Sequence, residues 1–183
     1  MNSKTHKLRS LYVLIGKKVK LRNLDEKDLK KCLFWLKDPK INKFLSQDFN
    51  DLSEMDELKW LREIKSSDKE LVFAIEARQE NNYIGNCGLH KIDWKNKRAT
   101  LGIVIGEKEY WGKGYGTDTI YTIASFAKKE LGIRSLELNV YEYNHRAIKV
   151  YKNCGFKRKT VLKKNHYYND RYWDTFIMER SLY

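Results

Sequence analysis

The chain has 183 residues, of which 42% are hydrophobic and 33% charged, and its formal net charge at pH 7 is +13. This length suits one domain, residues 1–183, and the hydrophobic content together with the plentiful aromatic residues favours a globular fold. No run approaches the ~20 apolar residues of a membrane span and no secretory signal is recognised, so we expect no membrane partner. Residues 1–10 are expected to be flexible. The three cysteines lack C-x-x-C spacing and predict reduced thiols in a cytoplasmic protein: Cys32, Cys87 and Cys154.

The first part of the chain predicts one strand and two helices. Val19 and Leu21 alternate with cationic residues, which is typical of a strand. Asp25 and Ser53 each precede acidic residues and then apolar residues at helical spacing, so both are expected to be helix N-caps. Pro39 is expected to end the first of these helices.

The middle of the chain predicts a sheet. Apolar segments at 71–77, 83–92 and 99–105 are separated by short turns, which favour antiparallel neighbours. Glycines within these segments indicate bulges or a close backbone approach by a ligand: Gly85, Gly88 and Gly102. A helix at 117–131 leads to a strand at 136–140, and this connection predicts a right-handed parallel crossover. The remaining expected elements are a helix that Asn144 caps and a closing hairpin at 156–162 and 168–178.

Three alternating glycines lie between the last of the three strands and the following helix: Gly112, Gly114 and Gly116. Glycine takes positive φ without strain, so backbone N–H groups there can converge at the helix N-terminus, where an anion is favoured. A Walker A loop would need glycine at Glu107 and Ser or Thr at Gly114. The dinucleotide pattern G-x-G-x-x-G also fails, because its third glycine would fall at Thr117 or Thr119. The run therefore predicts a phosphate-binding loop of another class.

Two ordered blocks resemble the GNAT N-acetyltransferase family. Residues 111–116 are similar to the family's Gln/Arg-x-x-Gly-x-Gly/Ala acyl-CoA loop, with Trp111 in place of Gln or Arg. Residues 144–156 are similar to its N-x-x-A-x-x-x-Y-x-x-x-G-F signature. The resemblance covers about residues 19–183 and is nearest to the branch of RimJ/RimL ribosomal-protein and spermidine acetyltransferases. It implies an α/β (α+β) GNAT fold, in which a mixed, mostly antiparallel sheet has a central splayed pair of parallel strands and flanking helices.

The resemblance also implies acetyl-CoA as co-substrate, with its pantetheine arm between the strands at 103–105 and 138–140 and its phosphates on the glycine loop. The N–H of Val104 would stabilise the oxyanion during transfer, and Tyr151 would protonate the leaving sulfur. The residues expected to bind acetyl-CoA are Ile103, Val104, Ile105, Trp111, Gly112, Lys113, Gly114, Tyr115, Gly116, Thr117, Asn139, Asn144 and Lys149. Further candidates for the phosphates are Arg146 and Lys152.

The general base stays open among Glu76, His90 and Asp93, because Thr100 stands where relatives often carry an acid. The two N-terminal helices and their connection are implied to form part of the acceptor pocket. Four aromatic residues there either line this pocket or pack in the core: Trp35, Phe44, Phe49 and Trp60. No histidine or cysteine spacing predicts a metal site.

We therefore predict a cytoplasmic, acetyl-CoA-dependent N-acetyltransferase that transfers acetyl directly to a primary amine, either a protein N-terminus or a small amine. Basic segments at 17–22 and 157–164 indicate either a solvated lysine-rich surface or docking on RNA or a ribosome. The alternatives are a non-catalytic nucleic-acid-binding or regulatory module on the same fold, and an amino-sugar or antibiotic acetyltransferase. Whether the chain forms a homodimer stays open.

Overall fold

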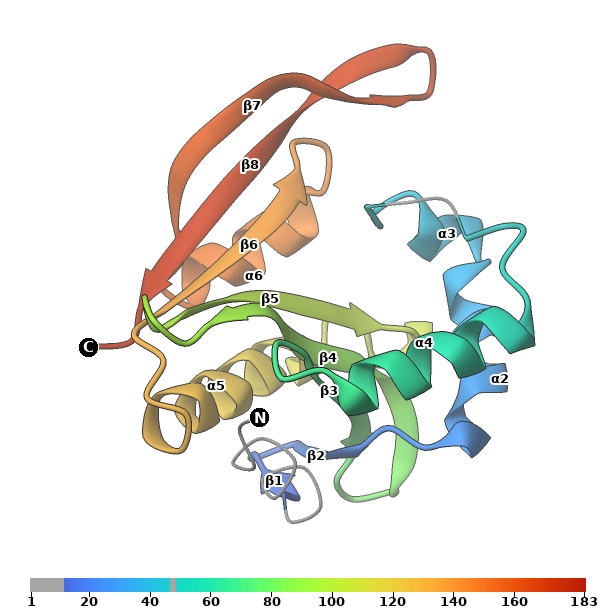
Figure 1. Cartoon of the computed structure of the whole chain (residues 1–183). Coiled ribbons are helices and arrows are strands. Elements are labelled where there is room, and N and C mark those ends of the chain that lie inside the picture. Colours follow the sequence, from blue (N-terminus) through green and yellow to red (C-terminus); the bar gives the residue numbers. More distant parts are fainter. Residues whose placement is uncertain (1–11, 47–48) are drawn as a thin grey trace.

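The computed structural model describes residues 12–46 and 49–183 and contains an eight-stranded sheet with helices on both faces (Figure 1). The strands lie in the order β1-β2-β3-β4-β5-β6-β8-β7, and β5 and β6 form a parallel pair within a mostly antiparallel sheet, as predicted. The strands are β1 (Leu14–Ile15), β2 (Val19–Asn23), β3 (Leu71–Ala77), β4 (Asn82–Asp93), β5 (Arg98–Ile105), β6 (Ser135–Tyr141), β7 (Lys157–Tyr168) and β8 (Arg171–Ser181). The helices are η1 (Glu26–Asp28), α2 (Leu29–Leu36), α3 (Pro39–Asn42), α4 (Glu54–Ser66), η2 (Lys108–Tyr110), α5 (Tyr115–Lys129) and α6 (His145–Asn153).

β3 lies inside the sheet and is buried on both faces. Side chains alternate along a strand, so Phe73 and Ile75 face a core cluster shared with α5, whereas Ala74 faces a second cluster shared with α2 and α4. Figure 1 shows α5 on one side of the sheet and α4 on the other. This double burial explains why residues 71–77 form a nearly continuous apolar run rather than an alternating one.

The parallel strands β5 and β6 separate after their first residues. They pair at three positions that end with Thr100↔Glu137, although β5 continues to Ile105 and β6 to Tyr141. α5 connects the two strands, so the predicted parallel crossover and its splayed pair are confirmed. Beyond Thr100, the facing edges of the two strands form the walls of a gap.

Local sequence signals predict most of the N-terminal elements. Asp25 and Ser53 each form a capping box with the aspartate three residues later, at the starts of η1 and α4. The role of Pro39 differs from the prediction, because α2 has already ended at Leu36 and Pro39 is the first residue of α3, where proline is favoured. β1 is not predicted, because two residues are too few for a periodic signal.

The closing hairpin is longer than predicted. β7 and β8 meet at a two-residue turn formed by Asn169 and Asp170, which both have positive φ, as a type I′ turn needs. The residues expected to form the loop at 163–167 belong to β7, and a register shift between Leu162 and His166 interrupts the pairing there. The hairpin therefore extends beyond the rest of the sheet (Figure 1).

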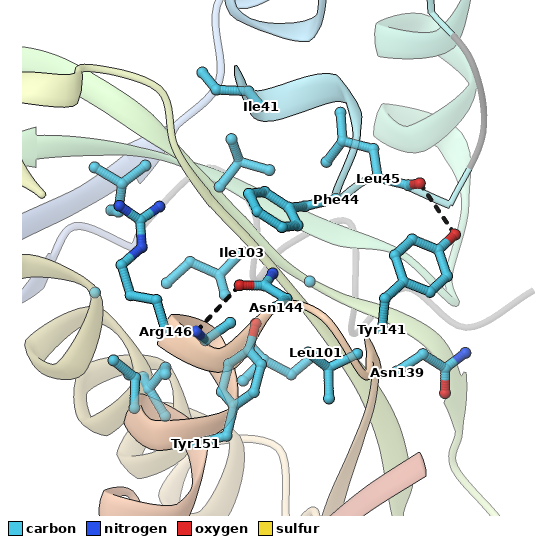
Figure 2. Close-up of a pocket in the computed structure, with 18 of the residues that line it drawn as sticks. Ile41, Phe44, Leu45, Leu101, Ile103, Asn139, Tyr141, Asn144, Arg146 and Tyr151 are labelled. Atoms are coloured by element: carbon cyan, nitrogen blue, oxygen red, sulfur yellow. Dashed lines mark hydrogen bonds between the residues drawn. The ribbon is translucent and has the colours of Figure 1, made fainter. Parts of the chain in front are cut away.

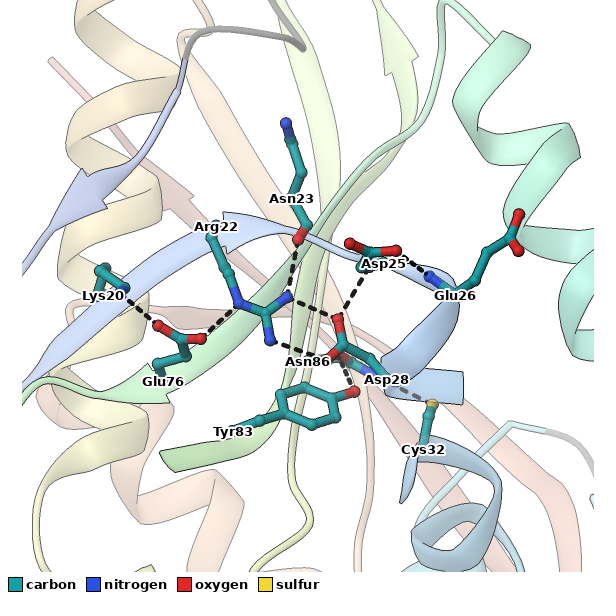
Figure 3. Close-up of polar contacts among 10 residues, drawn as sticks. All are labelled: Lys20, Arg22, Asn23, Asp25, Glu26, Asp28, Cys32, Glu76, Tyr83 and Asn86. Carbon is teal, nitrogen blue, oxygen red and sulfur yellow. Dashed lines mark hydrogen bonds and ion pairs between the residues drawn. The ribbon is translucent and has the colours of Figure 1, made fainter. Parts of the chain in front are cut away.

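A network of charged and polar side chains joins η1 and β2 to β3 and β4 (Figure 3). Arg22 makes a two-bonded ion pair with Asp28, at 2.6 and 2.8 Å, and a third bond to Glu76 at 2.5 Å. The side chain of Asp28 is 5% exposed and that of Arg22 is 19% exposed. Asp28 also accepts the backbone N–H of Asp25 at 2.9 Å. The start of α2 is therefore held to the sheet by buried charge rather than by apolar contact alone.

We expect Asp28→Ala to lower the free energy of unfolding by about 3 kcal/mol, because it leaves a largely buried guanidinium without its main partner. Urea denaturation followed by circular dichroism measures this loss. Glu26→Ala is the matched control, since Glu26 is exposed on the same turn, and its effect should stay within about 0.5 kcal/mol. Equal stabilities for the two variants would show that the network does not stabilise the fold.

Ion pairs neutralise part of both basic segments. In the first segment, Lys20 and Arg22 are paired with carboxylates of the sheet and η1. In the second, Lys159 bridges Glu137 and Glu179, and Lys163 is also paired. The positive charge open to a polyanion is therefore smaller than the net charge of +13 suggests.

All three cysteines are buried and form no disulfide, and burial raises the pKa of the Cys32 thiol to about 12.

Within residues 12–46 and 49–183, no helix is both long and apolar enough to cross a bilayer. In the same described residues, no three His, Cys, Asp or Glu side chains are grouped as metal ligands. The cytoplasmic location stays a prediction.

Candidate active site

A cavity of about 840 Å³ opens where β5 and β6 separate (Figure 2). The glycine loop and the first turn of α5 line one end of it, the diverging strands line the middle, and residues from α3 and the β7–β8 hairpin line the far end. The predicted site residues that line it are Ile103, Val104, Ile105, Trp111, Gly112, Gly114, Tyr115, Gly116, Thr117, Asn139, Asn144 and Tyr151. Lys113 and Lys149 are exposed outside the cavity, and Lys152 borders a separate small recess.

The glycine loop leaves the N-terminus of α5 open toward this cavity. Gly112 and Gly114 have φ values of 74° and 86°, a left-handed conformation that other residues rarely adopt. Gly114 is the N-cap of α5 and has no side chain with which to bind the first N–H groups of the helix. Asp118 fixes this end of α5 by accepting the backbone N–H groups of Lys18 and Val19 at 2.7 and 3.0 Å. The loop and helix therefore have the geometry of an anion site.

Trp111 has a defined role although it departs from the motif. Its indole N–H donates to the carbonyl of Ile105 at 2.7 Å, which ties the loop to the end of β5. The guanidinium of Arg146 lies 3.9 Å from the centre of the Trp111 ring, so the indole face also holds a cation at the cavity wall. The tryptophan thus places a positive charge beside the loop instead of donating to a ligand through its own side chain.

The register of β5 corrects the role predicted for Val104. Gly106, just after β5, donates its N–H to the carbonyl of Ile84 in β4. Val104 lies two residues earlier and is paired with Asn86 of β4. Because backbone groups alternate in direction along a strand, the N–H of Val104 points toward β4 and not into the gap. The backbone groups that face the gap are those of Ile103 and Ile105.

α6 brings two predicted residues to the cavity. The Oδ1 of Asn144 accepts the N–H of Ala147 at 3.2 Å, so this residue caps α6 while its Nδ2 group remains a donor for a ligand. Figure 2 shows the hydroxyl of Tyr151 directed toward Asn144. Burial raises the pKa of Tyr151 to about 12, so its phenol stays protonated at neutral pH and can act as an acid.

The far end of the cavity is enclosed by aromatic contacts that the sequence pattern does not predict. Tyr141 stacks on His166 with ring centres 3.8 Å apart. The hydroxyl of Tyr141 also donates to the carbonyl of Leu45 at 3.1 Å (Figure 2). Tyr143 stacks on Phe44 with ring centres 5.7 Å apart. These contacts join the segment after α3 to the hairpin. No local signal marks them, because the partners lie far apart in the sequence.

Of the four aromatic residues expected at this pocket, only Phe44 lines the cavity within the part of the chain that the structure describes. Trp35 is buried against Tyr83 of β4, with ring centres 4.7 Å apart. Trp60 packs against the smaller core cluster, and Phe49 does not line the cavity. The packing interpretation therefore applies to Trp35 and Trp60.

The three candidate bases differ in position. Glu76 is paired with both Lys20 and Arg22, at 2.6 and 2.5 Å, and does not line the cavity. Asp93 is the last residue of β4, and its carboxylate accepts the backbone N–H of Asn96 and a guanidinium N–H of Arg98. His90 of β4 lines the cavity. His90 is therefore the candidate that the fold brings to the site.

Sequence comparisons connect this chain with known acetyltransferases. A family model described as an acetyltransferase (GNAT) domain matches residues 18–157. The N-acetyltransferase p20 of Bacillus licheniformis is 24% identical over 148 residues, which cover 80% of this chain and 82% of that protein. The spermidine N(1)-acetyltransferase of Vibrio cholerae is 29% identical over 102 residues, which cover 56% of this chain and 58% of that protein.

Solved structures share the whole architecture. The spermidine N-acetyltransferase from Vibrio cholerae in complex with CoA and spermine superposes with a TM-score of 0.84 and 23% identity, covering 91% of this chain and 97% of that chain. A dodecameric structure of the Vibrio cholerae enzyme gives a TM-score of 0.76 and 26% identity, covering 91% of this chain and 95% of that chain. The splayed sheet around the cavity therefore belongs to a known fold.

Proposed function

Because this chain belongs to the GNAT acetyltransferase family and uses acetyl-CoA as its co-substrate, we propose that it acetylates the N-terminal amine of a peptide or protein. The observation that carries this proposal is the cavity, which runs from an anion site at α5, through the gap between β5 and β6, to an end without carboxylates among its described residues. The enzyme is an N-acetyltransferase, and the proposal concerns the class of amine that it acetylates.

The residues present fit acetyl-CoA. The uncapped N-terminus of α5 and the left-handed Gly112 and Gly114 would hold the phosphates, with Arg146 as a cationic neighbour. The backbone groups of Ile103 and Ile105, together with the Nδ2 group of Asn144, would bind the pantetheine amides, which need partners when they leave water. The cavity volume of about 840 Å³ lies within the range of cofactor sites.

When bound, acetyl-CoA supplies an activated acyl group. The gap-facing N–H groups of β5, from Ile103 or Ile105, would stabilise negative charge on the acyl oxygen. Tyr151 would donate its proton to the leaving sulfur, because burial raises the pKa of its phenol and keeps it protonated at neutral pH. The chain therefore supplies the binding, the electrostatic stabilisation and the acid, each from a different element of the fold.

The charges around the cavity support an N-terminal amine over a polyamine. The cavity is lined by Lys40, Lys91 and Arg146, and none of its described lining residues is Asp or Glu. A polyamine carries several positive charges that these residues would repel. An N-terminal amine has a pKa of ~8 against ~10 for an alkylamine, so a much larger share of it is neutral at pH 7. The neutral form is the nucleophile.

Thiol release from acetyl-CoA tests the proposal with three acceptors: an alanine-initiated hexapeptide, spermidine and glucosamine. We expect kcat/KM for the peptide to exceed that for spermidine at least tenfold. This ratio corresponds to about 1.4 kcal/mol, which a single repulsive contact between like charges can supply. Calorimetry with acetyl-CoA alone serves as the binding control. A higher kcat/KM for spermidine or glucosamine would overturn the acceptor class. Binding without turnover on any of the three would favour the non-catalytic alternative.

The remaining partners stay predictions. RNA or ribosome docking rests on the exposed cations of β7, such as Lys157 and Lys164, which have no ion pair among the described residues. A homo-oligomer is supported by the dodecameric structure of the Vibrio cholerae enzyme, which is 26% identical to this chain.

A further inference from the structure

His90 and Glu70 form a pair at the edge of the cavity. The Nδ1 atom of His90 lies 2.5 Å from the Oε2 atom of Glu70. The other carboxylate oxygen of Glu70 accepts the backbone N–H of Lys91 at 3.1 Å, so the carboxylate is held on both sides. The side chain of His90 is 32% exposed and that of Glu70 is 24% exposed. The imidazole is therefore oriented by a carboxylate and still open to the cavity that it lines.

Two facing glycines make the space for this imidazole. Gly88 of β4 is paired with Gly102 of β5, and a Cβ atom at either residue would lie close to the Nε2 atom of His90, at 3.0 and 2.8 Å respectively. The sequence predicts a bulge or a close approach by a ligand at Gly88 and Gly102, whereas the group that lies close to both in the structure is a side chain of the same chain. Gly102 directly precedes Ile103, whose backbone groups open into the gap. The fold places Nε2 next to the gap.

The hydrogen bond to Glu70 sets the tautomer of His90. A carboxylate only accepts hydrogen bonds, so Nδ1 carries the proton of the neutral ring. The Nε2 atom then carries the lone pair, on the side that faces Gly88 and Gly102. Among the described charged groups in this region, Lys91 adjoins the pair, and Glu137 on the same row of the sheet is neutralised by Lys159 at 2.9 Å. Thr100, opposite His90, is uncharged.

We propose that Nε2 of His90 is the proton acceptor for the incoming amine and that Glu70 is its positioning residue, an inference that rests on the proposed function. An ammonium that becomes an amide loses two protons. Nε2 takes the first, which frees the nitrogen lone pair for attack on the acyl carbon as the carbon–sulfur bond breaks. The second proton of the amine returns to Tyr151 and replaces the proton that Tyr151 gave to sulfur. The proton on His90 then passes to solvent, so both protons are accounted for.

His166 is the competing imidazole. Its Nε2 atom lies 3.1 Å from the hydroxyl oxygen of Tyr143, and that hydroxyl donates to the carbonyl of Lys43. The Nε2 atom of His166 is therefore the donor to Tyr143 and is already used in holding the hairpin. Its ring also stacks on Tyr141. These contacts give His166 a role in enclosing the cavity, whereas His90 has its lone pair directed toward β5.

The test compares His90→Gln with wild type on the alanine-initiated hexapeptide or spermidine, whichever the wild type acetylates faster. We expect kcat at pH 7 to fall about 100-fold, with the Kd for acetyl-CoA unchanged. If the peptide is used, the loss should shrink about tenfold at pH 9.5, where an amine of pKa ~8 is already neutral. With spermidine it should shrink in the same direction. Glu70→Gln should show a smaller loss with the same pH trend, because it keeps an acceptor but removes the charge.

His145→Gln is the control, since His145 is exposed on α6 and does not line the cavity. Nitrogen-15 NMR of the imidazoles provides a readout independent of turnover, and it should show the neutral ring of His90 protonated at Nδ1. The proposal is overturned by protonation at Nε2, by a loss that does not change with pH, or by the same pH-dependent loss in His166→Gln instead. Wild-type protein that acetylates no amine overturns the proposed function itself, and this outcome is distinct from the others.

Discussion

Tyr151→Phe is expected to lower kcat by about 100-fold or more while the Kd for acetyl-CoA stays within about twofold. The change removes one hydroxyl and keeps the ring, which lies 6.0 Å from the ring of Phe156 and helps to pack α6. Without that hydroxyl the sulfur must leave as a thiolate or take its proton from water. Thiol release under saturating acetyl-CoA and acceptor measures the loss, and calorimetry measures the binding.

Tyr121→Phe is the matched control for this prediction. Its hydroxyl donates to the carbonyl of Asn153 at 3.1 Å, so the control also removes a hydrogen-bonded phenol, but one outside the cavity. We expect it to keep kcat within about twofold. Because burial raises the pKa of Tyr151 to about 12, wild-type kcat should not decline between pH 8 and 10, where an unshifted phenol would begin to ionise. A Tyr151→Phe variant with nearly normal kcat would exclude the phenol as the acid.

The features that the sequence predicts well are those that depend on neighbouring residues. The capping residues Asp25 and Ser53 act within one helical turn, and the glycine loop acts through its own backbone. A short stretch of sequence is therefore enough to predict both features. The parallel crossover follows in the same way from a strand, a helix and a strand in succession. The predicted ends of β3, β4, β5 and β6 agree with the structure to within one residue, because turn residues mark where each strand begins and ends.

The features that the sequence does not predict depend on register or on distant partners. The direction of the Val104 N–H is fixed by the pairing of β5 with β4, and a shift of one residue would reverse it. The contact of Tyr141 with Leu45 joins residues 96 positions apart. Glu70 meets His90 because β3 and β4 are antiparallel, and no spacing rule links the two. Such pairs become visible only when the sheet is assembled.

Gly114→Asp is expected to raise the Kd for acetyl-CoA about 30-fold above that of Gly114→Asn. Asn and Asp both tolerate the left-handed φ of 86° and have the same shape, so the pair of variants differs in charge alone. At an effective dielectric constant of 20, a carboxylate ~5–6 Å from a phosphate is repelled by about 3 kcal/mol. Lys18, whose side chain lies 3.8 Å from the site of a new Cβ, would offset part of this repulsion.

Calorimetry measures the two Kd values, and two further comparisons assign the effect to the phosphates. The ratio should shrink in 1 M salt, because the screening length falls from ~10 Å at 0.1 M to ~3 Å. It should also disappear for S-acetylpantetheine, which lacks the phosphates. Gly132→Asp and Gly132→Asn form the remote control, since Gly132 has a φ of 67° and open surroundings beyond the far end of α5. Equal Kd values for Gly114→Asp and Gly114→Asn would mean that the phosphates bind elsewhere, and the assignment of the α5 N-terminus as the anion site would then be wrong.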